Sequence, residues 1–134
     1  MSKRYALFIG RWQPFHKGHE WLIDRKRGQG VPVLIAVRHI PPDEHNPLES
    51  YDVCKLIRLR YAHDPNVEVI LIPDIESVNW GRGVGYEPIE HEPPPAIHNI
   101  SATQIRAQIA AGDDSWRAHV DTTIQARLKE LLEC

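Results

Sequence analysis

The chain alternates short apolar runs with longer segments whose apolar residues recur every three to four positions. Three runs rich in Val, Ile and Leu predict buried strands, at residues 5–9, 31–37 and 67–72. Strands that are apolar throughout belong to sheets covered on both faces, and such sheets are usually parallel. The segments between them, 17–27 and 50–63, have helical spacing and are long enough to be crossover helices.

This β-α-β-α-β order predicts the α/β class, with a Rossmann-like parallel sheet and helices on both faces. With a further short strand near 85–90, we expect the sheet to have about four to five strands. Ser101 followed by Gln104 is a capping-box pattern, so a helix is expected to begin there and to end at Gly112. A last helix is expected at about 122–133.

Composition and charge narrow the class of protein further. The 134 residues, 42% hydrophobic and 25% charged, predict one soluble globular domain spanning 1–134. The net charge of −2 gives no basic excess for nucleic acid or an anionic membrane, so neither is expected as a partner. We find no run long enough for a signal peptide and expect a cytoplasmic location. Cys54 and Cys134 form neither a metal-ligand spacing nor a disulfide framework.

The stretch from Gly10 to His19 holds the strongest candidate chemistry. It follows the first predicted strand and opens the first predicted helix, where unpaired backbone N–H groups attract anions. Gly10 permits a tight turn and a close approach of phosphate. His16 and His19 lie three residues apart on one helix face, with Arg11 and Lys17 beside them. The pattern predicts a polyphosphate site. A purely structural turn is the alternative, and so is a zinc site with His39 or His45 as third ligand.

A second candidate lies near the end of the chain, in the sequence Ile-Ser-Ala-Thr-Gln-Ile-Arg at 100–106. Ser101 and Thr103 stand where a helix N-terminus offers N–H groups, and Arg106, one turn on, can fork onto a phosphate oxygen. Alone, Ser101 reads as a plain helix cap. Beside the first motif, we interpret the segment as a second phosphate contact.

Together the two motifs resemble the nucleotidylyltransferase superfamily, whose His-x-Gly-His and Ile-Ser-x-Thr-x-x-Arg patterns match residues 16–19 and 100–106. The resemblance is closest to archaeal-type nicotinamide mononucleotide adenylyltransferases. It spans 1–112 and leaves 113–134 as a C-terminal helical segment. It implies transfer of an NMP, with ATP favoured over CTP as donor, to a small phosphorylated acceptor, releasing pyrophosphate. Mg²⁺ would be held by phosphates and not by protein side chains.

The resemblance also implies roles for individual residues. The catalytic set is His16, His19, Arg11 and Lys17; the nucleotide-binding set is Gly10, Gln13, Gly18, Ser101, Thr103 and Arg106; the acceptor-binding set is Asp74, Trp80, Arg38 and Asn46. Trp80 reads equally well as a surface-loop aromatic, and Arg38 as the ion-pair partner of Asp43 or Glu44.

The sequence leaves three alternatives open. The donor could be CTP, as in a cytidylyltransferase, or the chain could be a nucleotide-binding regulator without turnover. A homo-oligomer is a further possibility. The proline-rich interval from 73 to 95 is shorter than in archaeal-type relatives, which places the wall around the base in doubt.

Overall fold

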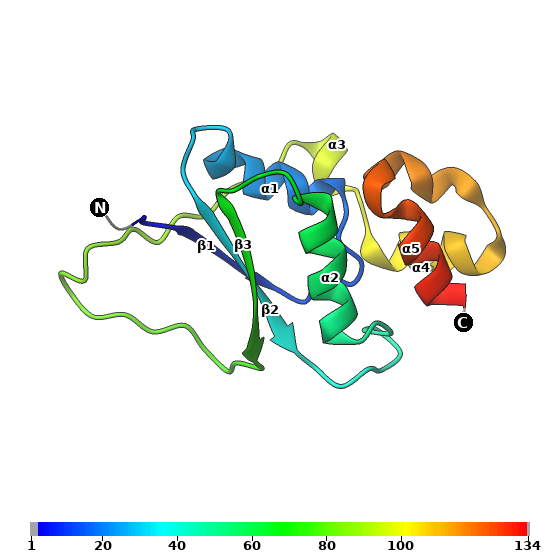
Figure 1. The fold of residues 1–134 in the computed structure, drawn as a ribbon, viewed down its shortest axis with the longest axis horizontal. Coiled ribbons are helices and arrows are strands. Elements are labelled where there is room, and N and C mark those ends of the chain that lie inside the picture. Colours follow the sequence, from blue (N-terminus) through cyan, green and yellow to red (C-terminus); the bar gives the residue numbers. More distant parts are fainter. Residues whose placement is uncertain (1–2, 134) are drawn as a thin grey trace.

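Three parallel strands form the centre of the computed structural model, which describes residues 3–133 (Figure 1). The strands β1 (Ala6–Gly10), β2 (Val33–His39) and β3 (Val67–Pro73) lie side by side in the order β1-β2-β3. Their register places Phe8 opposite Ile35 and Ile35 opposite Val69. The helices α1 (Lys17–Arg27) and α2 (Ser50–Arg60) make the two crossovers.

The predicted α/β class and Rossmann-like parallel sheet are confirmed, but the predicted number of strands is wrong. Within residues 3–133 the sheet has three strands, not four to five. The stretch near 85–90 forms no strand because Gly83 and Gly85 adopt φ values of +76° and +84°, which take the backbone out of the extended conformation. Pro88 also lacks the N–H group that a sheet ladder uses.

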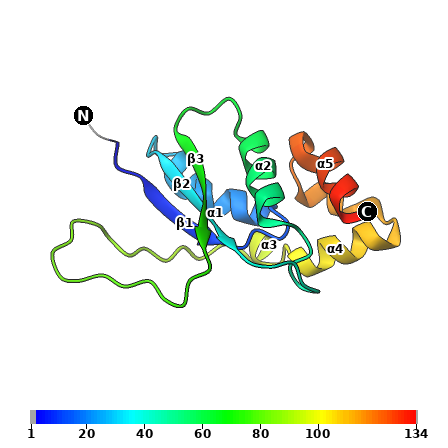
Figure 2. The ribbon, with the colours of Figure 1, turned by 60° about the horizontal axis from the view of Figure 1, so that its bottom comes forward.

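The two faces of the sheet differ in their covering. Consecutive parallel strands joined by right-handed crossovers place both crossover helices on one face, as Figure 2 shows for α1 and α2. On that face Phe8, Ile35 and Val69 are buried. On the other, the side chains of Leu7 and Ile70 remain 54% and 38% exposed. The helices therefore bury one side of the sheet far more completely than the other.

The C-terminal part forms a second helical layer against α2. It consists of α3 (Pro95–His98), α4 (Ala102–Ala111), the 3₁₀ helix η1 (Asp114–His119) and α5 (Thr122–Glu133). The predicted start of α4 is confirmed, because the Ser101 hydroxyl accepts from the N–H of Gln104 at 3.2 Å. Gly112 ends the helix with a φ of +72°. The helix α5 packs on both α2 and α4.

A partly buried ionic cluster connects this layer to the first helix. Glu20 Oε1 accepts from Arg60 Nη2 at 2.8 Å, and Arg60 Nε lies 3.2 Å from Asp121 Oδ2. The three residues come from α1, α2 and the turn before α5. Buried ion pairs add little net stability, but removing one partner leaves an uncompensated charge. The cluster therefore fixes α5 relative to the helix that carries His19.

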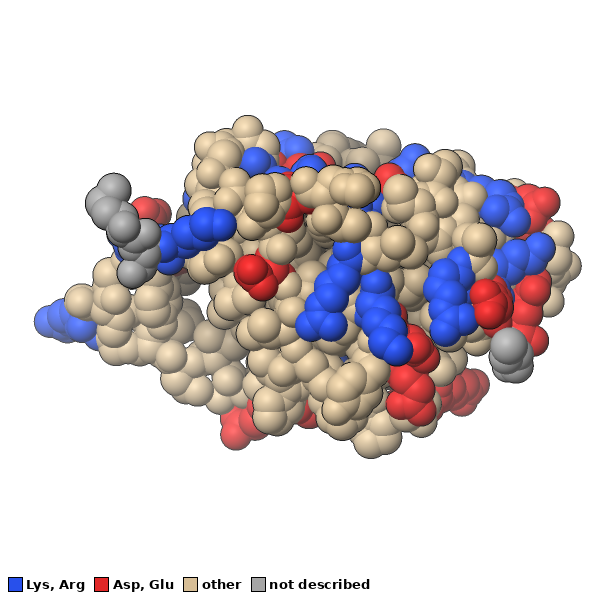
Figure 3. All heavy atoms as spheres, viewed as in Figure 1, with Lys and Arg blue, Asp and Glu red and all other residues tan. Residues whose placement is uncertain are grey.

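Charges on the surface are mixed in sign. On the face drawn in Figure 3, Lys and Arg side chains over α2 and α5 stand among Asp and Glu side chains and form no continuous basic field. Across residues 3–133, none of the helices has the length and hydropathy needed to cross a bilayer.

Candidate active site

The turn after β1 is built around the indole of Trp12. Trp12 adopts a φ of +55°, and its Nε1–H donates to the Ala36 carbonyl of β2 at 3.1 Å. A Cβ atom on Gly10 would lie 2.8 Å from Trp12 Cε2, closer than packed carbon atoms come. The glycine is therefore required by the tryptophan ring, a role different from the predicted approach of phosphate.

Gln13 joins this turn to the loop before α2. Its side-chain Nε2 donates to the Leu48 carbonyl at 2.9 Å, and its Oε1 accepts from the Leu48 N–H at 3.0 Å. The Gln13 amide thus makes a donor and an acceptor bond to the backbone of Leu48, as a neighbouring peptide group in a sheet would. Because both of its polar atoms are used in this way, Gln13 holds the turn in place and presents its own backbone carbonyl to the cavity side.

The two histidines of the motif hold each other's orientation. His16 is the N-cap of α1, and its Nδ1 accepts from the N–H of Gly18 at 3.0 Å. The His16 N–H in turn donates to His19 Nδ1 at 3.2 Å, and the rings stack with centroids 3.7 Å apart. Since each Nδ1 is an acceptor, a neutral ring carries its proton on Nε2. Each imidazole can therefore donate from Nε2.

Burial keeps these rings neutral. Burial, as the larger cause, and the nearby His119 together lower the pKa of His16 to about 4. Burial also lowers the pKa of His19 well below its ordinary value, with His16 as the second cause. At pH 7 the pair consequently acts as two neutral hydrogen-bond donors and not as imidazolium cations.

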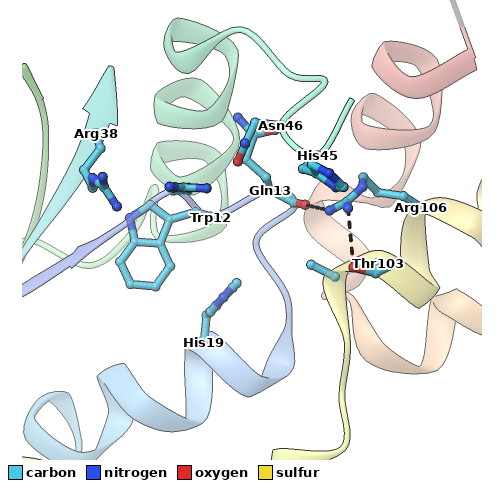
Figure 4. Close-up of a pocket in the computed structure, with 10 residues that line it drawn as sticks. Trp12, Gln13, His19, Arg38, His45, Asn46, Thr103 and Arg106 are labelled. Carbon is cyan, nitrogen blue, oxygen red and sulfur yellow. Dashed lines mark hydrogen bonds between the residues drawn. The ribbon is translucent and has the colours of Figure 1, made fainter. Parts of the chain in front are cut away.

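An open cavity of about 400 Å³ lies where the two sequence motifs come together (Figure 4). The turn after β1, the helix α1, the end of β2, the loop before α2 and the start of α4 surround it. It is lined by Arg11, Trp12, Gln13, His19, Arg38, His45, Asn46, Ala102, Thr103 and Arg106. The predicted site residues in this lining come from both motifs and from the predicted acceptor-binding set.

Arg106 makes the direct connection between the motifs. Its Nη1 donates to the Gln13 carbonyl at 2.6 Å, across 93 positions of sequence, and its Nη2 lies 3.5 Å from Thr103 Oγ1 (Figure 4). The side chain of Arg106 therefore crosses from the second helix start to the first turn. A single bound anion can reach groups from both.

Several predicted site residues lie away from this cavity. Among the described residues, its lining leaves out five members of the predicted catalytic and nucleotide-binding sets: Gly10, His16, Lys17, Gly18 and Ser101. His16 is buried behind His19, and Gly18 is needed because a Cβ there would meet His16 Cε1 at 2.8 Å. Lys17 is exposed on α1, where its charge helps to lower the pKa of Asp121. Gly10, Gly18 and His16 thus shape the first turn, whereas Ser101 caps α4.

The predicted acceptor-binding residues are divided between two places. Arg38 and Asn46 line the cavity, whereas Trp80 is 55% exposed and lines a second hollow of about 970 Å³ beside β1, visible in Figure 3 at the left of the molecule. Asp74 forms an ion pair with Arg38 at 2.6 Å. The alternative partners expected for Arg38, Asp43 and Glu44, are thus replaced by Asp74.

His45 is a cavity residue that the sequence suggested only as a zinc ligand. The carboxylate of Asp43 accepts from the N–H of His45 at 2.9 Å and from the N–H of Asn46 at 2.7 Å. This Asx turn directs His45 into the cavity beside Arg106, as Figure 4 shows. An Asp two residues before a histidine was the signal that could have placed it.

Electrostatics make the cavity a site for anions. Three guanidinium groups, from Arg11, Arg38 and Arg106, line it, and among the described residues no carboxylate does. Within residues 3–133 no group of three His, Cys, Asp or Glu side chains could hold a metal ion, so the zinc alternative has no support there. A polyphosphate fits this charge pattern.

Comparison with known proteins places these features in a family. No protein-family model matches the chain. A protein of Ignicoccus hospitalis named nicotinamide-nucleotide adenylyltransferase is 30% identical over 163 aligned positions, covering 94% of this chain and 91% of that protein. The chain belongs to the nicotinamide-nucleotide adenylyltransferase family. It is accordingly a nucleotidyltransferase.

A second relative aligns over the same share of both chains at a lower identity. An uncharacterized protein of Aeropyrum pernix is 26% identical over 163 positions, with the same coverage of both chains. Because 163 positions exceed the 134 residues of this chain, the alignment contains insertions in both relatives that have no counterpart here.

Proposed function

We propose that the chain transfers AMP from ATP to a pyridine mononucleotide and releases pyrophosphate. The observation that carries the proposal is the hydrogen bond from Arg106 to the Gln13 carbonyl, which brings the two phosphate motifs to one cationic cavity. The name of the Ignicoccus hospitalis relative supports a nicotinamide mononucleotide type of acceptor.

In the proposed reaction, a phosphate oxygen of the acceptor attacks the α-phosphorus of ATP in line. A new P–O bond forms, the bond from the α-phosphorus to the oxygen that bridges to the β-phosphorus breaks, and its electron pair leaves with pyrophosphate. The attacking oxygen is already anionic, so the step needs no general base. Catalysis is then positioning together with stabilisation of developing charge.

The cavity residues divide this work between them. His19 donates from Nε2 toward the α-phosphoryl oxygens, and it does so as a neutral group whose orientation His16 fixes. Thr103 and Arg106, with His45 beside them, hold the β- and γ-phosphates. Arg11 lies in the same lining and balances the charge of the transferred group.

Mg²⁺ fits this site as an ion bound through the substrate. The described cavity lining offers no carboxylate, so phosphate oxygens and water would supply the ligands. When bound, Mg²⁺ supplies neutralisation of the triphosphate charge. The protein's own contribution is the fixed set of arginine and imidazole donors.

The test is a panel of nucleoside triphosphates against phosphorylated acceptors with Mg²⁺. Pyrophosphate release is followed by a coupled assay, and ³¹P NMR identifies the new pyrophosphate linkage in the product. We expect turnover with ATP and a pyridine mononucleotide, reduced roughly 30-fold in Arg106→Gln by loss of a charge-assisted contact.

Other outcomes assign another function. Faster turnover with CTP than with ATP would make the chain a cytidylyltransferase. Tight ATP binding by calorimetry with no pyrophosphate released from any pair would indicate a nucleotide-binding regulator.

A further inference from the structure

Arg38 occupies the end of the cavity opposite Arg106, with Trp12 between them (Figure 4). It lies in β2 near its C-terminal end, and its side chain is 23% exposed. Asp74, just after β3, accepts a hydrogen bond from Arg38 Nε through Oδ1 at 2.8 Å, and the same oxygen lies 2.6 Å from Arg38 Nη2 in an ion pair. One edge of the guanidinium is therefore fixed against the protein.

The other edge of that guanidinium remains available to a ligand. Among the described residues, no group accepts a hydrogen bond from Arg38 Nη1, and Arg38 lines the cavity where Asp74 does not. A ligand at this end thus meets the guanidinium and not the carboxylate. Asp74 acts as a positioning residue that presents Arg38.

The charge at this end is positive even after the ion pair is counted. The hydrogen bond from Arg38 holds the pKa of Asp74 below its usual range, and Arg11 also lowers it. Asp74 is consequently ionised at neutral pH and cancels one of the two arginine charges. Arg11 and Arg38 together with Asp74 therefore carry a net charge of +1, which is available to a ligand.

We propose that Arg38 selects an acceptor that carries an anionic group on its ring, a pyridine carboxylate in preference to the carboxamide. This inference rests on the proposed function. If Thr103 and Arg106 hold the pyrophosphate end of ATP, the acceptor brings its phosphate to the centre of the cavity near His19. The part of the acceptor farthest from its phosphate then lies toward Arg38.

The chemistry of the two acceptors differs in one group. A carboxylate forms a charge-assisted pair with the free edge of a guanidinium, whereas a carboxamide offers one neutral acceptor and no charge. A hydrogen bond to a charged group is about tenfold stronger than a hydrogen bond between neutral groups. Arg38 therefore discriminates between acceptors that are otherwise the same size.

The experiment measures kcat/KM with ATP for nicotinate mononucleotide and nicotinamide mononucleotide. We expect the wild-type chain to favour the nicotinate compound by about tenfold or more. Arg38→Gln should remove this preference, chiefly by slowing the reaction of the nicotinate compound, and Arg38→Lys should retain part of it. Arg82→Gln, on the exposed segment after β3, is the matched control and should keep the full preference.

Equal kcat/KM values for the two acceptors in the wild type would overturn the inference. So would an equal loss for both acceptors in Arg38→Gln, which is what a purely structural partner of Asp74 would give. If neither acceptor is adenylylated, the proposed function fails. Calorimetric binding of the two mononucleotides then decides the inference separately: wild-type preference for nicotinate that Arg38→Gln abolishes supports it, and equal affinities overturn it.

Discussion

The two turns that meet at the cavity differ in how deeply they are built into the fold. Every residue from Trp12 to His16 in the first turn is buried, whereas in the second turn Ser101 and Ala102 are half-buried and Thr103 is exposed. In the first turn the His19 side chain accepts a backbone N–H and also faces the ligand site. In the second, the Ser101 hydroxyl caps the helix while its neighbour Thr103 lines the cavity.

The difference separates two ways of building a binding site. The first turn uses the same side chain for folding and for chemistry, so its substitutions are expected to reduce stability and activity together. The second turn assigns these tasks to different side chains. Its substitutions are expected to reduce activity while the free energy of unfolding stays nearly constant.

The largest expected effect is that of His19→Ala. Loss of a positioned donor lowers kcat by about 100-fold, equivalent to about 3 kcal/mol of transition-state stabilisation. The variant also loses the acceptor for the His16 N–H and the stack on His16, which lowers the free energy of unfolding by about 1 kcal/mol. Steady-state kinetics and urea unfolding measure the two effects. Reduced activity with an unchanged free energy of unfolding would contradict the proposal that the first turn serves folding and catalysis with the same side chain.

Gly10→Ala tests the first turn through packing alone. The added methyl would meet the Trp12 ring at 2.8 Å, and overpacking of this kind destabilises by about 1–3 kcal/mol. Thermal and urea unfolding give the size of the effect. The control is Gly81→Ala, which adds a methyl group in open space. Gly30→Ala would be a poorer control, because Gly30 has a φ of +78° and any side chain there is strained. Equal stability of Gly10→Ala and Gly81→Ala would show that Trp12 can move aside.

The histidine pair predicts how stability depends on pH. The folded-state pKa of His16 is about 4, below the ordinary value of 6.5, so the unfolded chain binds the proton more readily. Stability is therefore complete above pH 6.5 and falls as the pH drops toward 4, by roughly 1.4 kcal/mol per pH unit for this group. Urea unfolding at pH 7 and pH 5, compared with His16→Asn, measures it.

The pH dependence of kcat tests the protonation state of His16 and His19 independently of stability. If neutral imidazoles are the donors, kcat stays level from pH 6 to pH 8. A steady fall in kcat as the pH rises from 6 to 8 would instead mean that the imidazolium form is required.

The smallest expected effect belongs to the second turn. Thr103→Val keeps the shape of the side chain and removes one phosphate donor, which raises KM for ATP about fivefold, in line with a hydrogen bond of about 1 kcal/mol. Because Thr103 is exposed, the free energy of unfolding should not change measurably. Gln104→Ala, at an exposed neighbouring position outside the cavity lining, is the control. A clear loss of stability in Thr103→Val would erase the contrast between the turns.

Much of the fold could be predicted because it follows from periodicity. The three strands and the helices α1, α2 and α5 were expected close to their observed bounds, since long apolar patterns specify them. The extra strand near 85–90 was not formed, because glycine conformations in one loop are set locally and not by the apolar pattern.

The site was predictable to a smaller degree. Motif spacing indicated His19, Thr103 and Arg106, but it could not tell that Gly10 makes room for Trp12 or that Asp74 pairs with Arg38. Such contacts join residues far apart in the chain. Their pairing depends on side-chain directions that no local pattern specifies.

The cluster of Glu20, Arg60 and Asp121 has a consequence for any shortened form of the chain. A version ending at Gly112 would lose Asp121 together with α5, the helix that packs on α2. Arg60 would keep a single anionic partner, and the apolar side of α2 would face water. Glu20 directly follows His19 in α1. Removing the last helix would therefore weaken the contacts that hold His19 in position.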